Sequence, residues 1–211
     1  MTTATLAYLA GQACVAFHAW LSRADRLERP DRVIFDFDPS GSDFAPVRAG
    51  ALAAARLLEQ LGLDAFVALT GSRGLHVVVP IDRGAGFDEV RGFARGVADR
   101  LAAGDPNHLT VEARKENRRG RVLIDVMRNA YARTAVVPYS ARLLPGAPVA
   151  TPLEWSELSS RRLQPQAYTL TTIARRLDAR GDPWADLPRR TRPLAPARRA
   201  LELMPALSRA T

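Results

Sequence analysis

The sequence has few of the residues on which disulfides, zinc sites and membrane spans depend. Cys14 is its only cysteine, so neither a disulfide framework nor a cysteine-based zinc cluster can form within one chain. This fits a reducing compartment, and we expect the protein in the cytoplasm. The apolar stretch at residues 6–21 contains Gln12 and His18, is too short to span a bilayer and follows no basic residue. We therefore expect a buried helix there rather than a membrane span or a signal peptide.

Lysine is almost absent, although the chain is strongly basic. The formal net charge is +8 over 211 residues, and Lys115 is the only lysine, so arginine supplies nearly all of the positive charge. A basic chain favours anionic partners, most often nucleic acids or nucleotides. An arginine-rich composition also reflects coding bias, so the charge alone leaves the partner open. The hydrophobic content of 47% suits one folded core of ordinary size.

Hydrophobic periodicity predicts an alternation of strands and helices. We expect strands at residues 32–38, 65–70, 75–81, 121–127 and 134–139, and helices at residues 6–21, 44–62 and 87–103. The order of the central elements is strand, helix, hairpin, helix, strand. This order indicates an α+β fold, with two helices on one side of a mainly antiparallel sheet.

The composition changes after the last predicted strand, where a proline-rich connector begins. Residues 153–179 are expected to be helical in pieces. A basic stretch and a short helix fill residues 183–211, which we expect to be peripheral or partly disordered. We divide the chain into a catalytic core at residues 1–160 and a helical, basic C-terminal extension at residues 161–211.

The tripeptide Asp36-Phe37-Asp38 is the strongest indication of chemistry. It lies at the end of a predicted strand, where residues i and i+2 point to the same face. Two carboxylates ~4 Å apart repel by roughly 4 kcal/mol at an effective dielectric constant near 20, and a bound cation relieves that repulsion. Oxygen ligands suit Mg²⁺ or Mn²⁺, which points to a two-metal site for phosphoryl chemistry. The alternative is turn chemistry, because Pro39-Ser40-Gly41 follows and Asp often caps turns.

Asp125 supplies a third carboxylate on another predicted strand. Its neighbours are apolar, and burying an unpaired carboxylate is costly, so it needs a partner. That partner is either Arg128 or a cation shared with Asp36 and Asp38. A structural salt bridge or an exposed sheet edge explains the residue equally well.

The loop Thr70-Gly71-Ser72-Arg73-Gly74 joins the two strands of the predicted hairpin. Its glycines let backbone amides approach an anion closely, its hydroxyl groups are donors, and its arginine adds charge. His76 follows on the second strand. The loop lacks the Lys-Ser/Thr ending of a Walker loop. It suits a triphosphate, although a glycine-rich hairpin by itself is usually only a hairpin.

Three further residues give weaker signals. His18 precedes the predicted strand that carries the acidic tripeptide, and a lone histidine near an apolar face is more often a core residue than a ligand. Arg128 and Arg142 flank the predicted strand at 134–139. Guanidinium groups bind phosphates well, but arginine is common throughout this chain.

Together, these segments resemble the polymerase domain of bacterial DNA ligase D, a branch of the archaeo-eukaryotic primase–polymerase superfamily. The resemblance extends from about residue 6 to about residue 158. The matching motifs are Ala7–Ala10, His18–Arg23, Pro30–Pro39, Thr70–Pro80, Lys115, Arg121–Asn129, Tyr139–Arg142 and Pro145–Val149. No ligase nucleophile motif is found, so we expect a polymerase domain that stands alone.

The resemblance implies an activity and a set of site residues. Asp36, Asp38 and Asp125 would be catalytic and would hold two divalent ions, either Mn²⁺ or Mg²⁺. The residues expected to bind the nucleotide are His18, Thr70, Ser72, Arg73, Gly74, His76, Arg128 and Arg142. The reaction would be template-directed addition of nucleotides, with ribonucleotides preferred over deoxyribonucleotides, to a primer 3′-hydroxyl. The fold would be the superfamily's α+β core with an RRM-like sheet.

The resemblance also implies a biological setting. The family fills DNA ends during non-homologous end joining, with the Ku protein and a DNA ligase as partners, which places it at the bacterial nucleoid and not at a membrane. In the family, an N-terminal module that grips the DNA precedes the segment that starts here at Met1. Its absence leaves a second interpretation open, that of a catalytically weak remnant that binds nucleotides or DNA.

Overall fold

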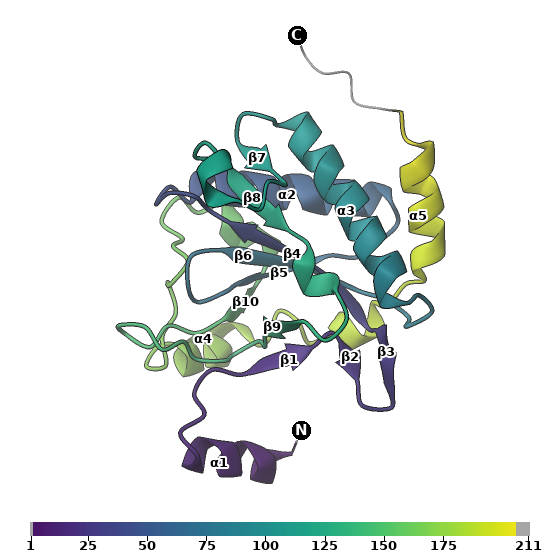
Figure 1. Cartoon of the computed structure of the whole chain (residues 1–211). Helices are drawn as coiled ribbons and strands as arrows, with labels where there is room; N and C mark the ends of the chain where they lie inside the picture. The colour runs from purple at the N-terminus through teal and green to yellow at the C-terminus, as the bar shows by residue number, and fades with distance from the viewer. Residues whose placement is uncertain (1, 206–211) are drawn as a thin grey trace.

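The computed structural model describes residues 2–205 around one six-stranded sheet (Figure 1). The strand order is β10-β5-β6-β4-β8-β7, and every neighbouring pair is antiparallel except β7 and β8. The strands are β4 Arg32–Asp38, β5 Phe66–Leu69, β6 Leu75–Pro80, β7 Leu109–Thr110, β8 Val122–Asp125 and β10 Thr151–Leu153. The predicted α+β fold with a mainly antiparallel sheet is confirmed. Met1 and residues 206–211, which end the predicted extension, lie outside the described residues.

Strand β4 lies at the centre of the sheet and divides the core into two faces. Val33, Phe35 and Phe37 alternate along it, are fully buried and point to the face covered by helices. The two covering helices are α2 Ala45–Gln60 and α3 Phe87–Gly104, which Figure 1 shows on the same side of the sheet. Both helices were predicted, because their apolar residues recur at helical spacing.

The other face of the sheet is covered by a small two-stranded ribbon. In it, β1 His18–Trp20 pairs with β9 Thr134–Val136 in an antiparallel register. A short hairpin of β2 Ser22–Arg23 and β3 Arg26–Pro30 follows β1. Leu21, Ile34, Val78, Phe87 and Ala135 form a second apolar cluster beneath this ribbon. The even-numbered residues of β4 therefore face this ribbon rather than the helices.

The predicted buried helix over residues 6–21 is wrong. Helix α1 spans only Thr3–Gly11, and none of its residues is buried. The chain then passes through Ala13, whose φ of 57° does not fit a right-handed helix, and continues into β1. The apolar residues after Gly11 imitate helical spacing, but the last of them belong to a strand that pairs with β9. No helix among residues 2–205 combines the length and the apolar character that crossing a bilayer requires.

The segment after β10 is helical in pieces, as predicted. The helical elements are η3 Trp155–Ser159, α4 Ile173–Arg180, η4 Leu187–Arg189 and α5 Leu194–Leu203. The expectation of a peripheral tail is wrong for α5, which lies beside α3 (Figure 1). Leu194 and Ala197 on its inner face are almost fully buried and belong to the main core. The amphipathic spacing of α5 explains this burial.

Candidate active site

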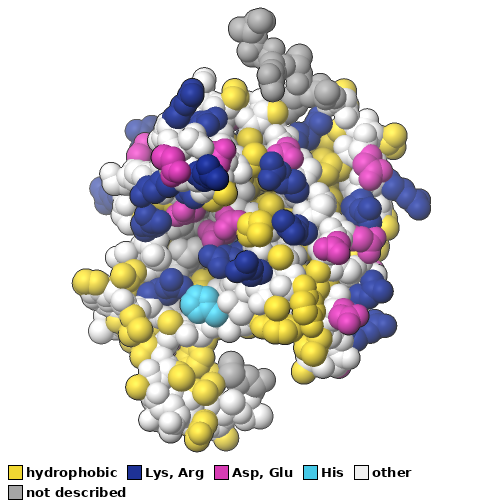
Figure 2. Space-filling view, viewed as in Figure 1, with side chains coloured by type: hydrophobic (Ala, Val, Ile, Leu, Met, Phe, Trp, Pro, Cys, Tyr) yellow, Lys and Arg dark blue, Asp and Glu magenta, His cyan; other side chains and the backbone are white. Residues whose placement is uncertain are grey.

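A polar cavity of about 230 Å³ opens where β4 and β8 end and β6 begins. Every predicted site residue lines it, together with Val136. The lining consists of His18, Asp36, Asp38, Thr70, Ser72, Arg73, Gly74, His76, Asp125, Arg128, Val136 and Arg142. On this face of the molecule, acidic side chains are surrounded by basic ones (Figure 2). The fold thus brings residues that lie far apart in the sequence, from His18 to Arg142, to one place.

The register of the sheet sets the three carboxylates close to one another. Asp36 on β4 lies directly opposite Asp125 on β8, and Asp38 follows two residues along β4. Because alternate residues share a face, Asp36 and Asp38 both point away from the helices and toward the ribbon of β1 and β9. His76 lies opposite Asp36 on the other neighbouring strand, β6. The acidic residues therefore occupy the polar end of an otherwise apolar face.

Two neighbouring side chains hold Asp36 in its ionised form. Its Oδ2 lies 3.5 Å from His76 Nε2 and 3.5 Å from Arg128 Nε, and its side chain is only 13% exposed. Burial would raise the pKa of this carboxyl, but His76 and Arg128 outweigh burial and hold the pKa below its usual range. Asp36 is therefore a carboxylate at neutral pH.

Asp38 is paired with two guanidinium groups. Its Oδ2 lies 3.0 Å from Arg118 Nη1, and its Oδ1 lies 3.2 Å from Arg73 Nη2. The side chain of Arg118 is only 10% exposed, and it also donates to the carbonyl oxygens of Glu112 and Ala113. The sequence did not single out Arg118, because it is one of several arginines in a polar segment. No local pattern separated it from its neighbours.

Asp125 has a different environment. Its Oδ1 accepts a hydrogen bond of 2.7 Å from the backbone N–H of Met127. Arg128, one of its two partners proposed from the sequence, pairs with Asp36 instead. No ion pair involving Asp125 is found within the described part of the chain. Its second carboxylate oxygen is therefore not committed to a neighbouring cation.

The carboxylates suit a hard cation, but Asp36 and Asp38 are at present paired with arginine side chains. No group of three His, Cys, Asp or Glu side chains among residues 2–205 is arranged to hold a metal ion. The guanidinium groups of Arg73, Arg118 and Arg128 neutralise the charge that a metal ion would otherwise neutralise. Three carboxylates on adjacent strands are a donor set that fits Mg²⁺ or Mn²⁺. Arg73 is 60% exposed, so it can turn away from Asp38 with little cost in packing.

The loop between β5 and β6 is fixed by its own hydrogen bonds and by close packing. Thr70 Oγ1 accepts from the backbone N–H groups of Ser72 and Gly74, each at 3.3 Å, and donates to the Gly74 carbonyl oxygen at 3.1 Å. A Cβ atom at Gly74 would overlap the carbonyl oxygen of Phe37 on β4. Glycine is therefore needed here for the approach of loop to strand, whatever the loop binds. The hydroxyl of Thr70 shapes the loop, and Arg73 projects from it.

Arg128 and Arg142 line the cavity together with the carboxylates, and His18 lies beside them. We call these three residues the cationic wall. His18 Nε2 lies 3.4 Å from Arg142 Nη1. Partial burial lowers the pKa of His18, and the positive charges of Arg142, Arg128 and His76 lower it further. His18 is therefore neutral at pH 7, and a bound anion would favour its protonation. It lies on β1, inside the ribbon, and not in a helix as the sequence suggested.

Asn129 and Ser140 position this wall, and no pattern in the sequence indicated either role. Asn129 is completely buried; its Oδ1 accepts from Ile34 N–H at 2.9 Å, and its Nδ2 donates to the carbonyl oxygens of Ile34 and Val126. These bonds fix the short helix η2 Met127–Asn129, which carries Arg128, onto β4. Ser140 Oγ accepts from the backbone N–H of Phe17 at 2.7 Å, next to His18.

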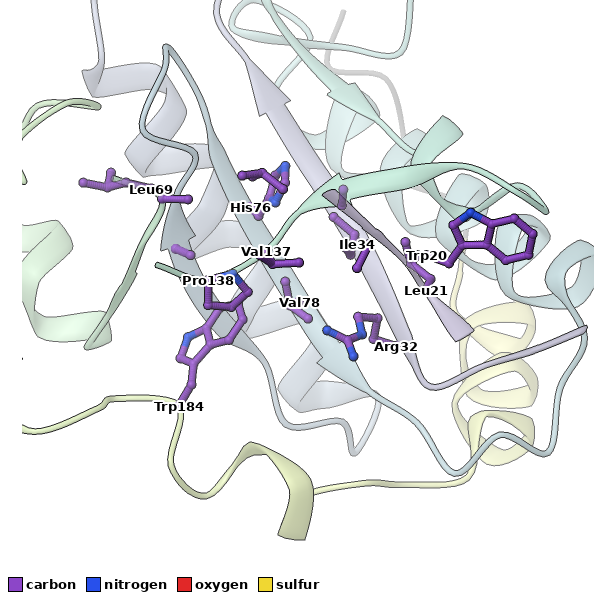
Figure 3. A pocket seen from close by; sticks show the side chains of 15 residues that line it. Trp20, Leu21, Arg32, Ile34, Leu69, His76, Val78, Val137, Pro138 and Trp184 are labelled. Atoms are coloured by element: carbon purple, nitrogen blue, oxygen red, sulfur yellow. The ribbon is translucent and has the colours of Figure 1, made fainter. Parts of the chain in front are cut away.

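A second, largely apolar pocket of about 30 Å³ lies between the sheet and the ribbon (Figure 3). It shares His76 and Val136 with the polar cavity, and its other lining residues include Ile34, Val78 and Trp184. A space of this size holds one or two water molecules but no nucleotide. The polar cavity is therefore the candidate active site.

The chain matches the family model described as the primase-polymerase domain of LigD over residues 1–184. The chain belongs to this family. The resemblance inferred from the sequence is confirmed, and the family is one of polymerase-type nucleotidyltransferases. Membership in this family also implies dependence on a divalent metal ion.

Curated relatives are much longer than this chain. It is 36% identical over 175 residues to the multifunctional non-homologous end joining protein LigD of Pseudomonas aeruginosa, covering 82% of this chain and 21% of that protein. It is 30% identical over 184 residues to the bifunctional LigD of Bacillus subtilis, covering 86% of this chain and 30% of that protein. The chain thus spans between a fifth and a third of the length of these relatives.

A solved structure confirms the fold. The polymerase domain of Mycobacterium tuberculosis ligase D, determined in complex with DNA, superposes with a TM-score of 0.79 at 29% sequence identity. The match covers 89% of this chain and 68% of that one. The α+β core with a mainly antiparallel sheet is therefore the fold of a LigD polymerase domain.

Proposed function

We propose that this protein adds nucleotides, preferentially ribonucleotides, to the 3′-hydroxyl of a DNA primer and thereby fills DNA ends before they are joined. The observation that carries the proposal is the single cavity in which three carboxylates face a wall of cationic side chains. The DNA complex of the Mycobacterium tuberculosis domain supports DNA as the template and primer. Ribonucleoside and deoxyribonucleoside triphosphates are the proposed substrates.

Asp36, Asp38 and Asp125 would hold two divalent ions, Mn²⁺ or Mg²⁺. When bound, such ions supply charge neutralisation at the transferring phosphate and activate the attacking hydroxyl. Asp36 is well suited to this role because its depressed pKa keeps it ionised at neutral pH. Asp125 offers an oxygen that no neighbouring cation occupies. The three carboxylates would thus fix the positions of the metal ions and balance part of their positive charge.

The cationic wall would bind the triphosphate. Arg142 and Arg128 present guanidinium groups, which form paired hydrogen bonds with phosphate oxygens. Burial and positive neighbours lower the pKa of His18, and an approaching anion would offset the part due to those charges and so favour the protonated form. His76 would remain beside Asp36 and fix its orientation. Most of the rate enhancement in such a site comes from positioning and electrostatics.

The loop after β5 would orient the phosphates from the opposite side. The backbone N–H groups of Ser72 and Gly74 already donate to Thr70 Oγ1, so the loop would contribute its fixed shape and the guanidinium group of Arg73 rather than free amide donors. Arg73 would turn from Asp38 to a phosphate oxygen once a metal ion neutralises the carboxylate. Arg73 would thus pair with Asp38 in the empty site and with a phosphate oxygen in the loaded site.

The setting of this activity follows from the family. We propose Ku and a separate DNA ligase as partners and the bacterial nucleoid as the place of action. We also propose residues 1–160 as the catalytic core and residues 161–211 as an extension.

A metal-dependent primer extension assay tests the proposal. Asp36→Ala and Asp125→Ala are each expected to abolish Mn²⁺-dependent extension of a gapped DNA while the circular dichroism spectrum is retained. Asp178→Ala is the matched control, because Asp178 is an exposed aspartate on α4 that does not line the cavity. Equal activity of the wild type and both site variants would rule the proposal out. Parallel reactions with each nucleotide type test the ribonucleotide preference.

A second candidate function is that of a nucleotide- or DNA-binding protein with little catalysis. The observation that favours it is the pairing of Asp36 and Asp38 with arginine and histidine side chains, which leaves no preformed metal site among the described residues. A salt titration separates the two functions. Steep salt dependence of DNA binding together with no extension product, at any Mn²⁺ or Mg²⁺ concentration, supports the binding protein.

A further inference from the structure

An exposed pair of aromatic rings lies next to the candidate active site. The side chains are Trp20, which is 37% exposed, and Tyr131, which is 53% exposed. Their ring centroids are 5.6 Å apart in an edge-to-face arrangement. Tyr131 also contacts Phe87 edge to face at 5.5 Å, and Phe87 is buried. The two rings are thus held in position from below while large parts of them remain in contact with water.

The fold places this pair directly beside the polar cavity. Trp20 follows His18 by two residues on β1, so the two side chains share a face of that strand about 7 Å apart. Tyr131 follows Arg128 by three residues, in the turn that leads from η2 to β9. Figure 3 shows the indole of Trp20 directed away from the small apolar pocket. The aromatic pair therefore continues the surface that begins with His18 and Arg128.

Two exposed arginines lie close to the aromatic pair in the chain: Arg91 one turn after Phe87 on α3, and Arg133 shortly after Tyr131. Arg91 on α3 donates to Met127 Sδ at 3.6 Å, and Met127 is itself 43% exposed. Arg133 is exposed, two residues after Tyr131. Neither Arg91 nor Arg133 forms an ion pair with another of residues 2–205. Figure 2 shows basic side chains next to hydrophobic ones on this face. Positive charge beside flat apolar rings is the pattern that binds single-stranded nucleic acid.

We propose that Trp20 and Tyr131 form a stacking platform for an unpaired base of single-stranded DNA. The inference rests on the proposed function and deepens it, because it names the part of the DNA that this surface recognises. The π-faces of the two rings would take a base of any sequence, while Arg91 and Arg133 would bind the flanking phosphates. A strand end that carries an unpaired overhang offers both features at once.

Binding measurements with matched DNAs and matched variants test the platform. The probes are a fluorescein-labelled oligo-dT of about 12 nucleotides and a blunt duplex with the same label. Tyr131→Leu keeps apolar bulk on Phe87 but removes the flat ring, and it is expected to weaken oligo-dT binding about tenfold. Tyr131→Phe keeps the ring and is expected to bind as the wild type does. Both variants should bind the blunt duplex, whose bases are already stacked, as tightly as the wild type.

The fluorescence of Trp20 gives a second measurement that does not depend on Tyr131. Stacking of a base quenches tryptophan emission, and Trp155 and Trp184 are partly buried, with their indole N–H groups bonded to backbone carbonyls. Saturating oligo-dT is expected to quench the wild type and to leave the emission of Trp20→Leu unchanged. Tyr8→Leu is the control variant, because Tyr8 is 68% exposed on α1, away from the cavity lining, and should leave oligo-dT binding unaffected.

Salt titrations separate stacking from charge. Arg91→Gln is expected to reduce the salt dependence of oligo-dT binding by about one phosphate contact, whereas Tyr131→Leu leaves that slope unchanged. Equal oligo-dT binding by Tyr131→Leu and Tyr131→Phe would overturn the platform. An equal loss on oligo-dT and on duplex would also overturn it, because a general structural change would then explain the effect.

The platform and the proposed function can fail separately. If Tyr131→Leu loses oligo-dT binding and the wild type extends no primer, the platform is supported and the proposed polymerase activity is ruled out. If the wild type extends primers and Tyr131→Leu binds oligo-dT as the wild type does, the polymerase activity is supported and the platform is ruled out.

Discussion

Asn129 has no exposed surface, and its side-chain oxygen and nitrogen are both hydrogen-bonded to backbone groups of Ile34 and Val126. Asn129→Leu has a similar volume but leaves the N–H and the carbonyl of Ile34 without a partner. Each buried unsatisfied group costs about 1–3 kcal/mol. We expect a loss of at least about 2 kcal/mol in the free energy of unfolding, measured by urea denaturation.

Asn117→Leu is the control for this measurement, since Asn117 is exposed and its side chain forms no hydrogen bond with the described residues. The control should change the free energy of unfolding by less than about 0.5 kcal/mol. A change of that size in Asn129→Leu as well would contradict the role of Asn129 in holding η2 on β4.

Asp31 predicts a dependence of stability on pH. It is buried, and its carboxylate binds Arg32 Nε at 2.6 Å and Arg23 Nε at 2.9 Å. Burial would raise the pKa of Asp31, but the hydrogen bonds and charges of Arg32 and Arg23 outweigh it and lower the pKa. A lowered pKa in the folded state stabilises the fold above the unfolded pKa, near 3.9, and the effect disappears as the pH falls through the folded value.

The comparison that checks this is between the wild type and Asp31→Asn. At pH 7 the wild type should be more stable by about 2 kcal/mol, because Asn forms weaker bonds with two cationic partners. Urea denaturation at decreasing pH should show this difference shrinking once the pH passes below about 4. A difference that stays constant down to pH 3 would show that the charge of Asp31 contributes nothing.

Residue-scale features divide into those that a sequence can reveal and those that need the fold. Asp36 and Asp38 were found because strand alternation puts i and i+2 on one face. Arg118 and Asn129 were not found, since their partners lie on β4, far away in the sequence. The sequence also could not decide the partner of Arg128, because that choice depends on which strand lies beside β4.

At the scale of elements, the loop between β5 and β6 can be tested by a glycine substitution, with a second glycine, in α3, as the control. A Cβ atom at Gly74 would overlap the Phe37 carbonyl, so Gly74→Ala must push the loop away from β4. We expect lower stability together with weaker nucleotide binding, measured by urea denaturation and by titration with a fluorescent nucleotide. Gly92→Ala in α3 meets no atom within 4 Å and should instead stabilise the protein by about 0.5–1 kcal/mol. Unchanged nucleotide binding in Gly74→Ala would show that the loop does not hold the nucleotide.

The elements that the sequence predicted correctly carry strong apolar patterns. Helices α2 and α3 each bury one apolar face at helical spacing, and β4, β5 and β6 are apolar runs that the sheet buries. The elements that were missed are short. Strands β1, β2 and β3 lie within residues 18–30 and are largely exposed, so they show no alternation of apolar and polar residues. Their pairing depends on β9 and on each other, which a local pattern does not reveal.

At the scale of the whole molecule, α5 lies in the proposed C-terminal extension but packs into the main hydrophobic core. Leu194 is only 2% exposed, and Arg198 on the outer turn pairs with Glu89 on α3. Leu194→Ala should lower the free energy of unfolding by about 2–5 kcal/mol, because it leaves a cavity in the main hydrophobic core. Leu203, at the end of the same helix, is 84% exposed, and Leu203→Ala should have little effect. Equal stability of the two variants in urea would contradict the packing of α5.

The order β6-β4-β8 has a consequence for how this protein is made. Asp36 and Asp38 are synthesised long before Asp125, and pairing β8 with β4 closes a long loop, which is a slow kind of step in folding. A partly synthesised chain thus carries two of the carboxylates without the third. An activity that needs all three carboxylates therefore also reports that β8 has paired with β4.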